Sequence, residues 1–421
     1  MTARGKHVLF ISRQRLVGTT NGSSTYLIDL ARAVRAAGMV PHLLQPAPTL
    51  MGRWPMLTLR PEMAVFETHV ARGLLRVGNR LISLSPRLYS SVARAGVAAL
   101  ARRAGVQAAW ARDRKAPYAV AIPWTAADHR FVAQHARGRC DVAIADYMFN
   151  AEAFADLPAG TPTAIVMHDL FHARGSAATD SVAQVERAHE VAMLARADAV
   201  IAIQATEARF VADEVPGTRA ILAPMAATPV ARPQPGTVDR LLFVGSDTAP
   251  NVDGLRWFFD AVWPSIRAAA PTTRLEVAGS VARAFPDGAP EGVTLLGLVD
   301  SLVPLYAAAG VVISPLTFGS GLKIKLIEAL AAGKAIVATP VTLQGVEREC
   351  AGAVDCTDDA AAFAAHVLAL RDDERRARQA AAALAVAVAH FSPAACYRDV
   401  QQWLTASVSP PSTPAPSAPA S

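Results

Sequence analysis

The chain has few cysteines, and the four present lie far apart in the sequence. Cys140, Cys350, Cys356 and Cys396 show none of the short paired spacings that hold structural zinc. A reducing cytoplasm is the simplest account of such unpaired thiols. We therefore expect a cytoplasmic protein without a structural metal or a disulfide framework.

Long apolar runs are missing as well. No run approaches the roughly 20 apolar residues needed to span a bilayer. The first apolar stretch, His7–Ile11, is too short for an export signal and has the length and composition of a first buried strand. These features predict a soluble or peripheral protein without a signal peptide.

The charge balance is basic, but the signals of nucleic-acid binding are missing. The formal net charge is +6, yet the sequence contains no basic low-complexity tail and no zinc-finger spacing. What remains is an alanine-rich chain of 421 residues, 52% hydrophobic and 18% charged, which fits a soluble α/β enzyme of two or three domains. The positive charge is compatible with anionic substrates or an anionic membrane surface.

The most informative stretch is Val311–Pro340, which predicts a strand, a loop, a helix and a second strand. Val311–Ile313 is short and β-branched, as a buried parallel strand requires. A helix is predicted over Leu322–Ala332, with Gly333 where a helix stop belongs. Ala335–Ala338 then predicts the next buried strand. The glycine-containing loop therefore joins a strand to a helix N-terminus.

That junction is a candidate anion site. Free backbone N–H groups and the positive end of the helix dipole favour a negative ligand there. Gly319 and Gly321 lie in the loop, Lys323 and Lys325 add two cations, and Glu328 follows one turn later. A phosphate near the lysines and a diol near the carboxylate would describe a nucleoside diphosphate with its ribose. The alternative is a surface loop with solvated lysines.

This segment resembles the donor-binding signature of group 1, family 4-like glycosyltransferases with the GT-B fold. The resemblance implies two Rossmann-like, doubly wound α/β domains that face each other across a cleft. It also implies that Glu328 binds the ribose hydroxyls and that Lys325 holds the diphosphate, with Lys323 and the loop glycines nearby. Many members carry an acidic residue that contacts the donor sugar where this chain has Ser320.

A second segment carries the same resemblance. A strand over Arg240–Val244 ends in Gly245-Ser246, and the run FVGS…PNVDGLRWFFDAVWP is similar to one branch of group 1 glycosyltransferases. In that branch the Gly-Ser loop lies near the donor phosphates or sugar. The arginine and lysine that many members carry next are replaced by Asp247–Pro250, so the resemblance leaves Lys323 and Lys325 as the phosphate-binding cations.

The base is expected to contact the backbone around Leu298, since relatives select the nucleotide at the corresponding turn. Main-chain contacts leave little side-chain record, so UDP, GDP and ADP donors stay open.

The first half of the chain predicts the other Rossmann-like domain. After the first strand, a helix is expected to follow Ser24 and to run through Tyr26 and Leu30 to Gly38, with Ser23 or Ser24 as its cap. Gly22 is expected to line the cleft, as the resemblance implies for a glycine loop before the first helix.

Two further buried strands, Val142–Ala145 and Thr163–Met167, are followed by polar pairs. The first pair is Asp146-Tyr147, and the second is His168-Asp169, with Arg174 shortly after. Ligands in open α/β sheets bind beyond the carboxyl ends of the strands, so both pairs are expected to face a cleft. The resemblance implies that His168 touches the donor sugar, with Asp169 orienting its ring and Arg174 as possible support.

Composition also predicts the domain limits. They are an N-terminal domain over residues 1–227, a proline-rich linker at 228–238, a second domain over 239–390, a C-terminal helix at 391–408 and a disordered tail at 409–421. The resemblance implies that the second domain binds the nucleotide sugar and that the C-terminal helix crosses back to the first domain.

The arginine-rich region 53–114 has two interpretations. Either it forms amphipathic helices packed on the sheet with arginines in water, or it forms a surface that rests on anionic lipid.

The resemblance thus implies a retaining, hexosyltransferase-like glycosyltransferase that moves a sugar from a nucleotide-diphosphate donor to a hydroxyl acceptor. The acceptor would be a glycan or a lipid-linked saccharide in polysaccharide or glycoconjugate synthesis. The enzyme would be cytoplasmic, with peripheral binding to the inner face of the plasma membrane as an option. Lys325, the helix N–H groups and His168 would carry catalysis without a metal or other cofactor, and closure about 228–238 would exclude water.

Three alternatives remain. A NAD-dependent oxidoreductase is disfavoured because no intact G-x-G-x-x-G follows the first strand. A nucleotide-sugar epimerase would share the architecture, and a non-catalytic nucleotide-sugar-binding protein is compatible with Ser320.

Overall fold

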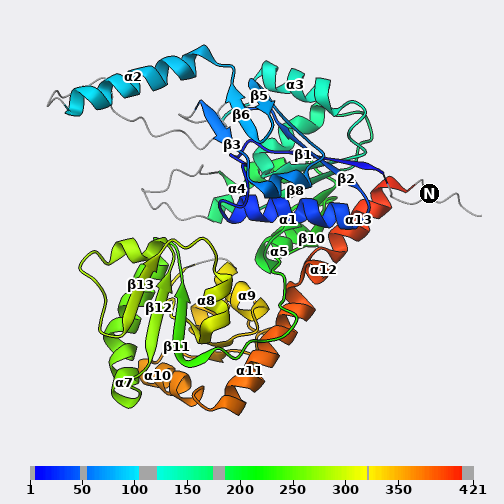
Figure 1. The fold of residues 1–421 in the computed structure, drawn as a ribbon. Helices are drawn as coiled ribbons and strands as arrows, with labels where there is room; N and C mark the ends of the chain where they lie inside the picture. The colour runs from blue at the N-terminus through cyan, green and yellow to red at the C-terminus, as the bar shows by residue number, and fades with distance from the viewer. Residues whose placement is uncertain (1–4, 48–54, 104–120, 174–184, 320–321, 410–421) are drawn as a thin grey trace, which may run out of the picture. The chain divides into compact units, whose positions relative to one another are not determined.

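The computed structural model describes residues 5–47, 55–103, 121–173, 185–319 and 322–409. The chain divides into two compact units (Figure 1). Unit 1 comprises Met1–Ile203, Glu207–Ala223 and Tyr397–Ser421, and unit 2 comprises Gln204–Thr206 and Pro224–Cys396. Four predicted features lie outside the described residues: Arg174, Ser320, Gly321 and the tail from residue 410 on.

Unit 1 is built on a seven-stranded parallel sheet with the order β10-β9-β8-β7-β1-β2-β4. Its strands are β1 (His7–Ile11), β2 (Val40–Gln45), β4 (Thr68–Ala71), β7 (Val142–Asp146), β8 (Thr163–Met167), β9 (Ala199–Ala202) and β10 (Arg219–Leu222). β7, β8 and β9 are buried along their whole length, as strands covered on both faces must be. The order reverses between β1 and β7, so a topological switch point lies at the carboxyl ends of these two strands.

The helices of unit 1 include α1 (Gly22–Ala36), α3 (Ala126–Ala136), α4 (Arg187–Leu194) and α5 (Ala205–Glu214). The cap of α1 differs from the prediction. Asn21 is the N-cap, and its side-chain oxygen accepts a hydrogen bond from Ser24 N–H. In turn, Ser24 Oγ accepts a hydrogen bond from Asn21 N–H. Ser24 is therefore the third residue of the helix and not its cap. Asn21 takes the cap position because its side-chain amide oxygen serves there as well as a serine hydroxyl does.

The arginine-rich region folds only partly as predicted. Its described residues form a separate antiparallel sheet in the order β3-β6-β5, followed by helix α2 (Pro86–Arg103). The strands are β3 (Met56–Thr58), β5 (Leu74–Val77) and β6 (Arg80–Ser83). The expectation of helices throughout was wrong because Gly78 (φ +59°) and Asn79 form a two-residue turn, which pairs the flanking strands as a hairpin.

Unit 2 contains a six-stranded parallel sheet in the order β13-β12-β11-β14-β15-β16. Its strands are β11 (Thr237–Val244), β12 (Arg274–Ala278), β13 (Val293–Gly297), β14 (Ala309–Ser314), β15 (Ala335–Ala338) and β16 (Asp355–Cys356). The order reverses between β11 and β14. This second switch point therefore lies where the Gly245 loop and the loop before helix α9 (Ile324–Ala331) leave the sheet.

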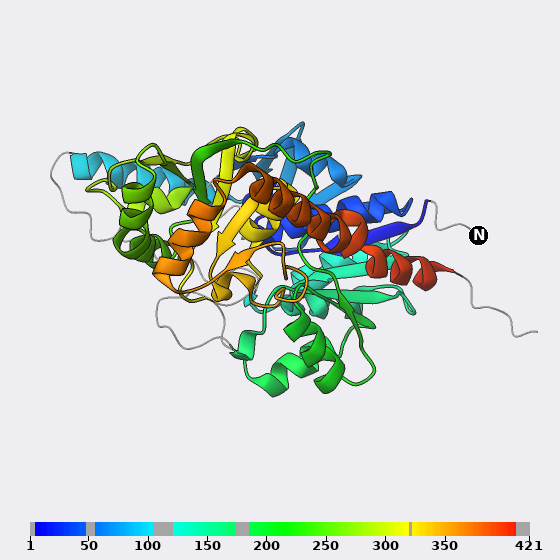
Figure 2. The same ribbon diagram turned by 90° about the horizontal axis from the view of Figure 1, so that it is seen from below.

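Apolar side chains cover both faces of this sheet. The helices that carry them flank the sheet in the ribbon (Figures 1 and 2). On one face lie α6 (Ala249–Trp257), α7 (Trp263–Ala269) and α10 (Ala360–Ala369). On the other lie α8 (Val303–Ala308), α9 and α11 (Asp373–Val386). The alternation of Leu241 and Leu242 between these two cores shows why the strand is a continuous apolar run.

The predicted linker at 228–238 is bound to unit 2. Val230 N–H donates to Ala331 O at 2.8 Å. The buried Lys334 ammonium donates to Gln234 O at 2.7 Å and to Ala309 O at 2.9 Å. The boundary between the units consequently falls at Ala223–Pro224, ahead of the predicted linker.

The C-terminal helices are divided between the two units, with the boundary between Cys396 and Tyr397. A π-helical turn ends at Phe391, a short α12 spans Pro393–Cys396, and α13 spans Arg398–Val408. In unit 1, Gln401 of α13 donates to Ala33 O at the end of α1, at 2.9 Å.

By length and composition, one helical stretch among the described residues could cross a membrane. It runs over Asp373–Val408, although the sequence showed no long apolar run. A third of its apolar window is buried inside the protein. Ala383, Ala387 and Phe391 of this stretch pack into the core of unit 2.

Candidate functional site

In unit 2, the predicted donor-site residues gather at the second switch point. Gly245 follows β11, and α9 follows the β14 loop on the neighbouring strand. Helix α6 approaches that loop closely, since a Cβ on Gly254 would lie 2.5 Å from Pro315 O. The sequence-predicted loops are therefore neighbours in space, at the position where open α/β sheets bind ligands.

A carboxylate and an ammonium meet on the first turns of α9. Lys325 Nζ lies 2.8 Å from both Glu328 Oε1 and Glu328 Oε2, three residues on. The carboxylate thus engages one side of the ammonium, and the hydrogens that point away from it are available to a further acceptor. Both side chains are partly exposed, so water screens the attraction between them.

Tyr306 of α8 completes this group from a different element. Its hydroxyl lies 3.5 Å from Glu328 Oε2. Burial raises the pKa of the Tyr306 hydroxyl well above its ordinary value, and the nearby Glu328 carboxylate adds to the rise. The phenol therefore stays protonated and directs its hydrogen toward Glu328. No sequence signal singled out this tyrosine, because its contact joins α8 to α9 across 22 residues.

Lys323 occupies the N-cap position of α9, and its side chain does not cap the helix. Burial lowers the pKa of its ammonium, so an anion beside it would favour the charged form. The first turn of α9 contains no acidic residue, which leaves the positive end of the helix dipole uncompensated by nearby carboxylates. Gly319, with φ +127°, has a backbone conformation that favours glycine.

The Gly245 loop is held by backbone contacts. Gly245 N–H donates to Ala278 O at 3.0 Å, and Gly245 O accepts from Val281 N–H at 3.3 Å. Gly279 has φ +108°, and a Cβ there would lie 2.0 Å from Gly245 O. The glycines thus let the loops after β11 and β12 pack against each other.

Ser246 is exposed on this loop. The side-chain amide of Asn251 donates to Ser246 O at 3.0 Å and braces the loop from the first turn of α6. Leu298, the predicted base-contacting residue, follows β13 and is 69% exposed. Leu298 follows β13, the outermost strand on that side of the sheet. One strand, β12, lies between β13 and β11, which leads into the Gly245 loop.

In unit 1, a buried carboxylate organises the first switch point. Asp146, at the end of β7, is fully buried and accepts from Ser12 Oγ at 2.6 Å and Gln14 Nε2 at 2.7 Å. His168 Nε2, beyond β8, lies 2.7 Å from the other carboxylate oxygen. Since hydroxyl and amide both donate to Asp146, the carboxylate is the acceptor of the cluster, and His168 Nε2 donates to it.

Aromatic rings fix the His168 imidazole from two sides. The Tyr147 ring lies 4.3 Å from it and the Tyr26 ring 5.7 Å, centroid to centroid. Tyr147 has φ +65°, a conformation that costs a non-glycine residue free energy and is common at functional sites. The imidazole thus has a set orientation, with Nδ1 left as the acceptor nitrogen.

The orienting role predicted for Asp169 belongs to Asp146. Asp169 Oδ1 accepts from the neighbouring Leu170 N–H at 2.9 Å, while the His168 ring is paired with Asp146. The reason is topological, because the end of β7 lies beside the end of β8, and Asp146 pairs in register with Val166. Gly22 is exposed at the N-terminus of α1.

Sequence reasoning missed Ser12 and Gln14. They follow β1, whereas Asp146 ends β7, and the two strands are adjacent despite their distance in the chain. Asp146 itself was placed at a strand end but received no role. A polar residue directly after the first strand was the one available signal.

Among the described residues, no three His, Cys, Asp or Glu side chains form a metal-binding group. A cavity of about 640 Å³ lies elsewhere in unit 2, beside β16, with Leu343, Cys350 and His366 in its lining. None of the predicted site residues lines it.

Comparison with known proteins agrees with this arrangement. Residues 238–373 match the family model described as "Glycosyl transferases group 1". No curated protein matches the chain.

Solved structures share the fold over nearly the whole chain. Anabaena HepE in complex with UDP has 15% identity and a TM-score of 0.57, covering 95% of this chain and 100% of that one. Sucrose-phosphate synthase from Thermosynechococcus elongatus has 16% identity and a TM-score of 0.55, covering 94% and 98%. Trehalose 6-phosphate synthase from Burkholderia multivorans has 14% identity and a TM-score of 0.55, covering 96% and 99%.

The two Rossmann-like units and the likeness to solved structures over nearly the whole chain show the GT-B fold. Within this fold, residues 238–373 of unit 2 are the part that matches the group 1 glycosyltransferase model. The recognition and the fold class predicted from the sequence are confirmed.

Proposed function

We propose that this protein is a retaining, metal-independent hexosyltransferase. It moves a sugar from a nucleoside-diphosphate donor to a hydroxyl of a glycan or lipid-linked saccharide, in cytoplasmic polysaccharide or glycoconjugate synthesis. The group of Lys325, Glu328 and Tyr306 at the N-terminal end of α9 carries this proposal, because it unites a cation, a carboxylate and helix N–H groups at a switch point.

The chemistry of this group fits both halves of a nucleoside diphosphate. The Lys325 hydrogens that point away from Glu328 and the N-terminal N–H groups of α9 suit the diphosphate oxygens. Glu328 accepts hydrogen bonds from a ribose diol. The Tyr306 hydroxyl donates to Glu328 Oε2 and so helps to fix the position of the carboxylate. Lys325 and Glu328 are paired with each other, so a donor that binds here shares the ammonium with the carboxylate.

Leaving-group stabilisation is the main catalytic effect that we propose. As the sugar–phosphate bond breaks, negative charge grows on the diphosphate, and fixed donors aimed at that charge lower the barrier. Lys323, Lys325 and the helix dipole supply this stabilisation from the chain itself.

His168 has the proposed role of placing the donor sugar. Its Nε2 is engaged by Asp146, so Nδ1 presents a lone pair to a sugar hydroxyl. Because Asp146 is buried and also bound by Ser12, the ring keeps this orientation before any substrate arrives.

The comparisons support the donor class. Structures of Anabaena HepE are described in complex with UDP, with UDP and glucose, and with UDP-glucose. A uridine nucleotide is therefore the first donor class to test for this chain.

A panel of nucleotide sugars tests the proposal. We expect at least one UDP-, GDP- or ADP-sugar to raise the melting temperature, since a ligand that binds the folded state stabilises it. The same donor with acceptor extracts should release nucleoside diphosphate and give an α- or β-linked product with the donor's anomeric configuration.

Three outcomes contradict the proposal. An inverted product excludes retention, a converted sugar without acceptor indicates an epimerase, and binding without any product indicates a non-catalytic protein. Activity lost on chelation and restored by a divalent cation contradicts metal independence.

A further inference from the structure

Tyr26 of α1 is fully buried and links three parts of unit 1. Its hydroxyl donates to Ala223 O at 2.7 Å. Its ring lies 5.7 Å from the His168 ring and 6.1 Å from the Tyr397 ring, centroid to centroid, and both pairs are edge-to-face. Aromatic rings attract each other at these distances and angles. One side chain therefore contacts the proposed sugar-placing histidine and two segments that are distant from it in the sequence.

The two distant segments are the places where the chain passes between the units. Apart from Gln204–Thr206, it does so at Ala223–Pro224 and at Cys396–Tyr397, which we call the two crossings. Ala223 directly follows β10 and is buried. The proline after it restricts Ala223 to extended conformations. The direction of the Ala223 carbonyl, to which Tyr26 donates, is therefore set at the crossing itself.

The returning segment is attached to α1 at a second point. Tyr397 is the N-cap residue of α13, and Gln401, one helical turn later, donates to Ala33 O. On α1, Tyr26 and Ala33 are two turns apart. These spacings place both contacts on one face of each helix. The returning chain thus packs along α1, with Tyr397 beside Tyr26.

The first turn of α1 is fixed to the cluster around His168 by a separate route. Ser23 Oγ donates to Gln14 Oε1 at 3.0 Å. The other end of the same amide, Gln14 Nε2, donates to Asp146. Asp146 also accepts from His168 Nε2. Helix α1 is therefore a fixed base from which the Tyr26 ring reaches the imidazole.

We infer that Tyr26 is a positioning residue that couples the His168 imidazole to the two crossings. Because packed side chains leave little free space between them, a displacement of Ala223 O or of the Tyr397 ring moves the Tyr26 ring, and that ring moves the imidazole. The hydrogen bond of Ser23 holds the helix, so the Tyr26 side chain takes up the displacement. Turnover then depends on both crossings, although neither contains a residue that we propose to contact substrate.

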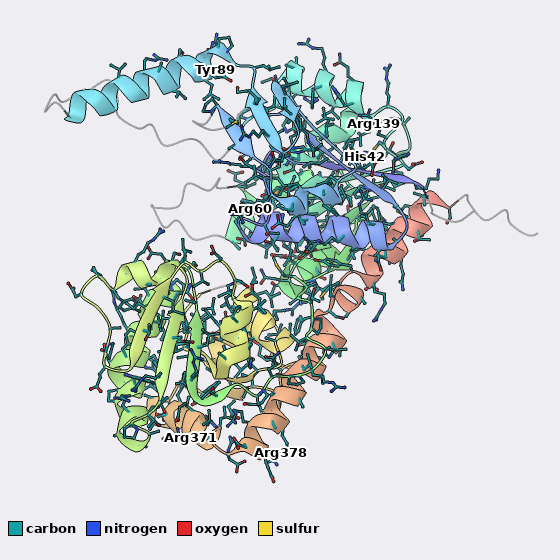
Figure 3. The ribbon with its side chains drawn as sticks, viewed as in Figure 1. His42, Arg60, Tyr89, Arg139, Arg371 and Arg378 are labelled. Carbon is teal, nitrogen blue, oxygen red and sulfur yellow. The ribbon has the colours of Figure 1, made fainter. Side chains whose placement is uncertain are left out.

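This inference rests on the proposed role of His168, so its first test uses neither donor nor acceptor. The test is the proton–carbon NMR spectrum of the full chain with isotope-labelled histidine, in which the His168 signal is identified by its loss in His168→Gln. In Tyr26→Phe the ring stays and the hydrogen bond to Ala223 O is lost. We expect the His168 signal to shift or broaden. The signal of His42, labelled in Figure 3, should stay in place because its ring contacts His7 instead.

A second pair of variants tests whether a crossing acts through Tyr26. Pro224→Gly frees the backbone at the first crossing, because glycine lacks the ring that fixes φ and that restricts the residue before it. It should shift the His168 signal in the wild-type background and clearly less in the Tyr26→Phe background. Equal shifts in both backgrounds show independent effects and overturn the coupling, and so does the absence of a shift in either.

Kinetics give the functional readout. Tyr26→Phe should lower kcat about fivefold, the factor that corresponds to one net hydrogen bond, and leave KM for the donor unchanged. Tyr89→Phe is the matched control and should keep both values. Tyr89, labelled in Figure 3, also donates to a backbone oxygen, Ser83 O at 3.1 Å, but it lies on α2. Val132→Ala is the stability control, since Val132 packs in a different buried cluster; it should lower the free energy of unfolding without lowering kcat.

The outcomes separate this inference from the proposed function. If the wild type transfers no sugar, the proposed function fails and the NMR spectra still decide the coupling. An unshifted His168 signal or an unchanged kcat in Tyr26→Phe overturns the positioning role. An equal loss of kcat in Val132→Ala also overturns it, because the effect then belongs to stability. A raised KM with unchanged kcat assigns Tyr26 to substrate binding instead.

Discussion

Replacement of Asp146 by asparagine tests the unit 1 site most directly. The carboxylate accepts from three side chains, His168 at 2.7 Å, Ser12 at 2.6 Å and Gln14 at 2.7 Å. An amide keeps the size but has one acceptor oxygen, so at least one of these donors loses its partner or meets an N–H group.

The expected loss follows from the energy of one charged hydrogen bond. Such bonds contribute about 1.5–3 kcal/mol, and the His168 bond is the one that fixes the imidazole for substrate. If that energy is lost in the transition state, Asp146→Asn lowers kcat by about 10–100-fold. Nucleotide binding should change little, because the proposed nucleotide contacts belong to unit 2.

The assay is release of nucleoside diphosphate with the donor found by the thermal-shift panel. Asp169→Asn is the matched control, since it makes the same chemical change one residue after His168 and leaves the Asp146 bond intact. Ser12→Ala removes one donor but keeps the carboxylate, so it should cost far less activity. If Asp169→Asn abolishes turnover while Asp146→Asn leaves kcat unchanged, the assignment of the orienting carboxylate is refuted.

Four further outcomes follow from the structure. Lys325→Ala should lower turnover at least about tenfold, because a charge-assisted phosphate contact contributes upward of ~1.4 kcal/mol; unchanged kinetics removes the lysine from catalysis. Glu328→Ala should weaken nucleotide binding in calorimetry, and equal affinity contradicts the ribose contact. Gly279→Ala should reduce the free energy of unfolding by about 1–3 kcal/mol more than Gly288→Ala in urea titrations, since both have positive φ but only Gly279 meets a backbone oxygen; equal losses exclude the steric cause. Burial lowers the pKa of the Lys334 ammonium from 10.5 to about 8, so between these pH values the unfolded chain binds more protons than the folded one. As pH rises through this window, the free energy of unfolding of the wild type should therefore increase by roughly 3 kcal/mol relative to that of Lys334→Met. Parallel curves of this free energy against pH contradict the shift.

The local course of the donor segment could be predicted because it depends on short-range signals. Apolar runs placed β14 and β15, and Gly333, with φ +60°, ends α9 as expected. The helix starts at Ile324 rather than Leu322, a shift at the end where no side chain caps it.

Contacts between distant segments could not be predicted in the same way. The Asp146 cluster depends on β1 and β7 being adjacent, which follows from strand order rather than from local sequence. The contact of Tyr306 with Glu328 likewise needs the packing of α8 against α9. The β5–β6 hairpin was missed for another reason, since its leucines and arginines were read at helical spacing although Gly78-Asn79 signals a turn.

The attachment of residues 224–236 to Lys334 and Ala331 has a practical consequence. Apart from Gln204–Thr206, unit 2 is one uninterrupted length of polypeptide, from Pro224 to Cys396. A gene fragment with those ends would keep the hydrogen bonds of residues 224–236 to the rest of unit 2. It would also contain every unit 2 residue proposed to bind the nucleotide, so it is the natural piece to express for crystallography with nucleotides. Unit 1 needs both termini of the chain and offers no such excision.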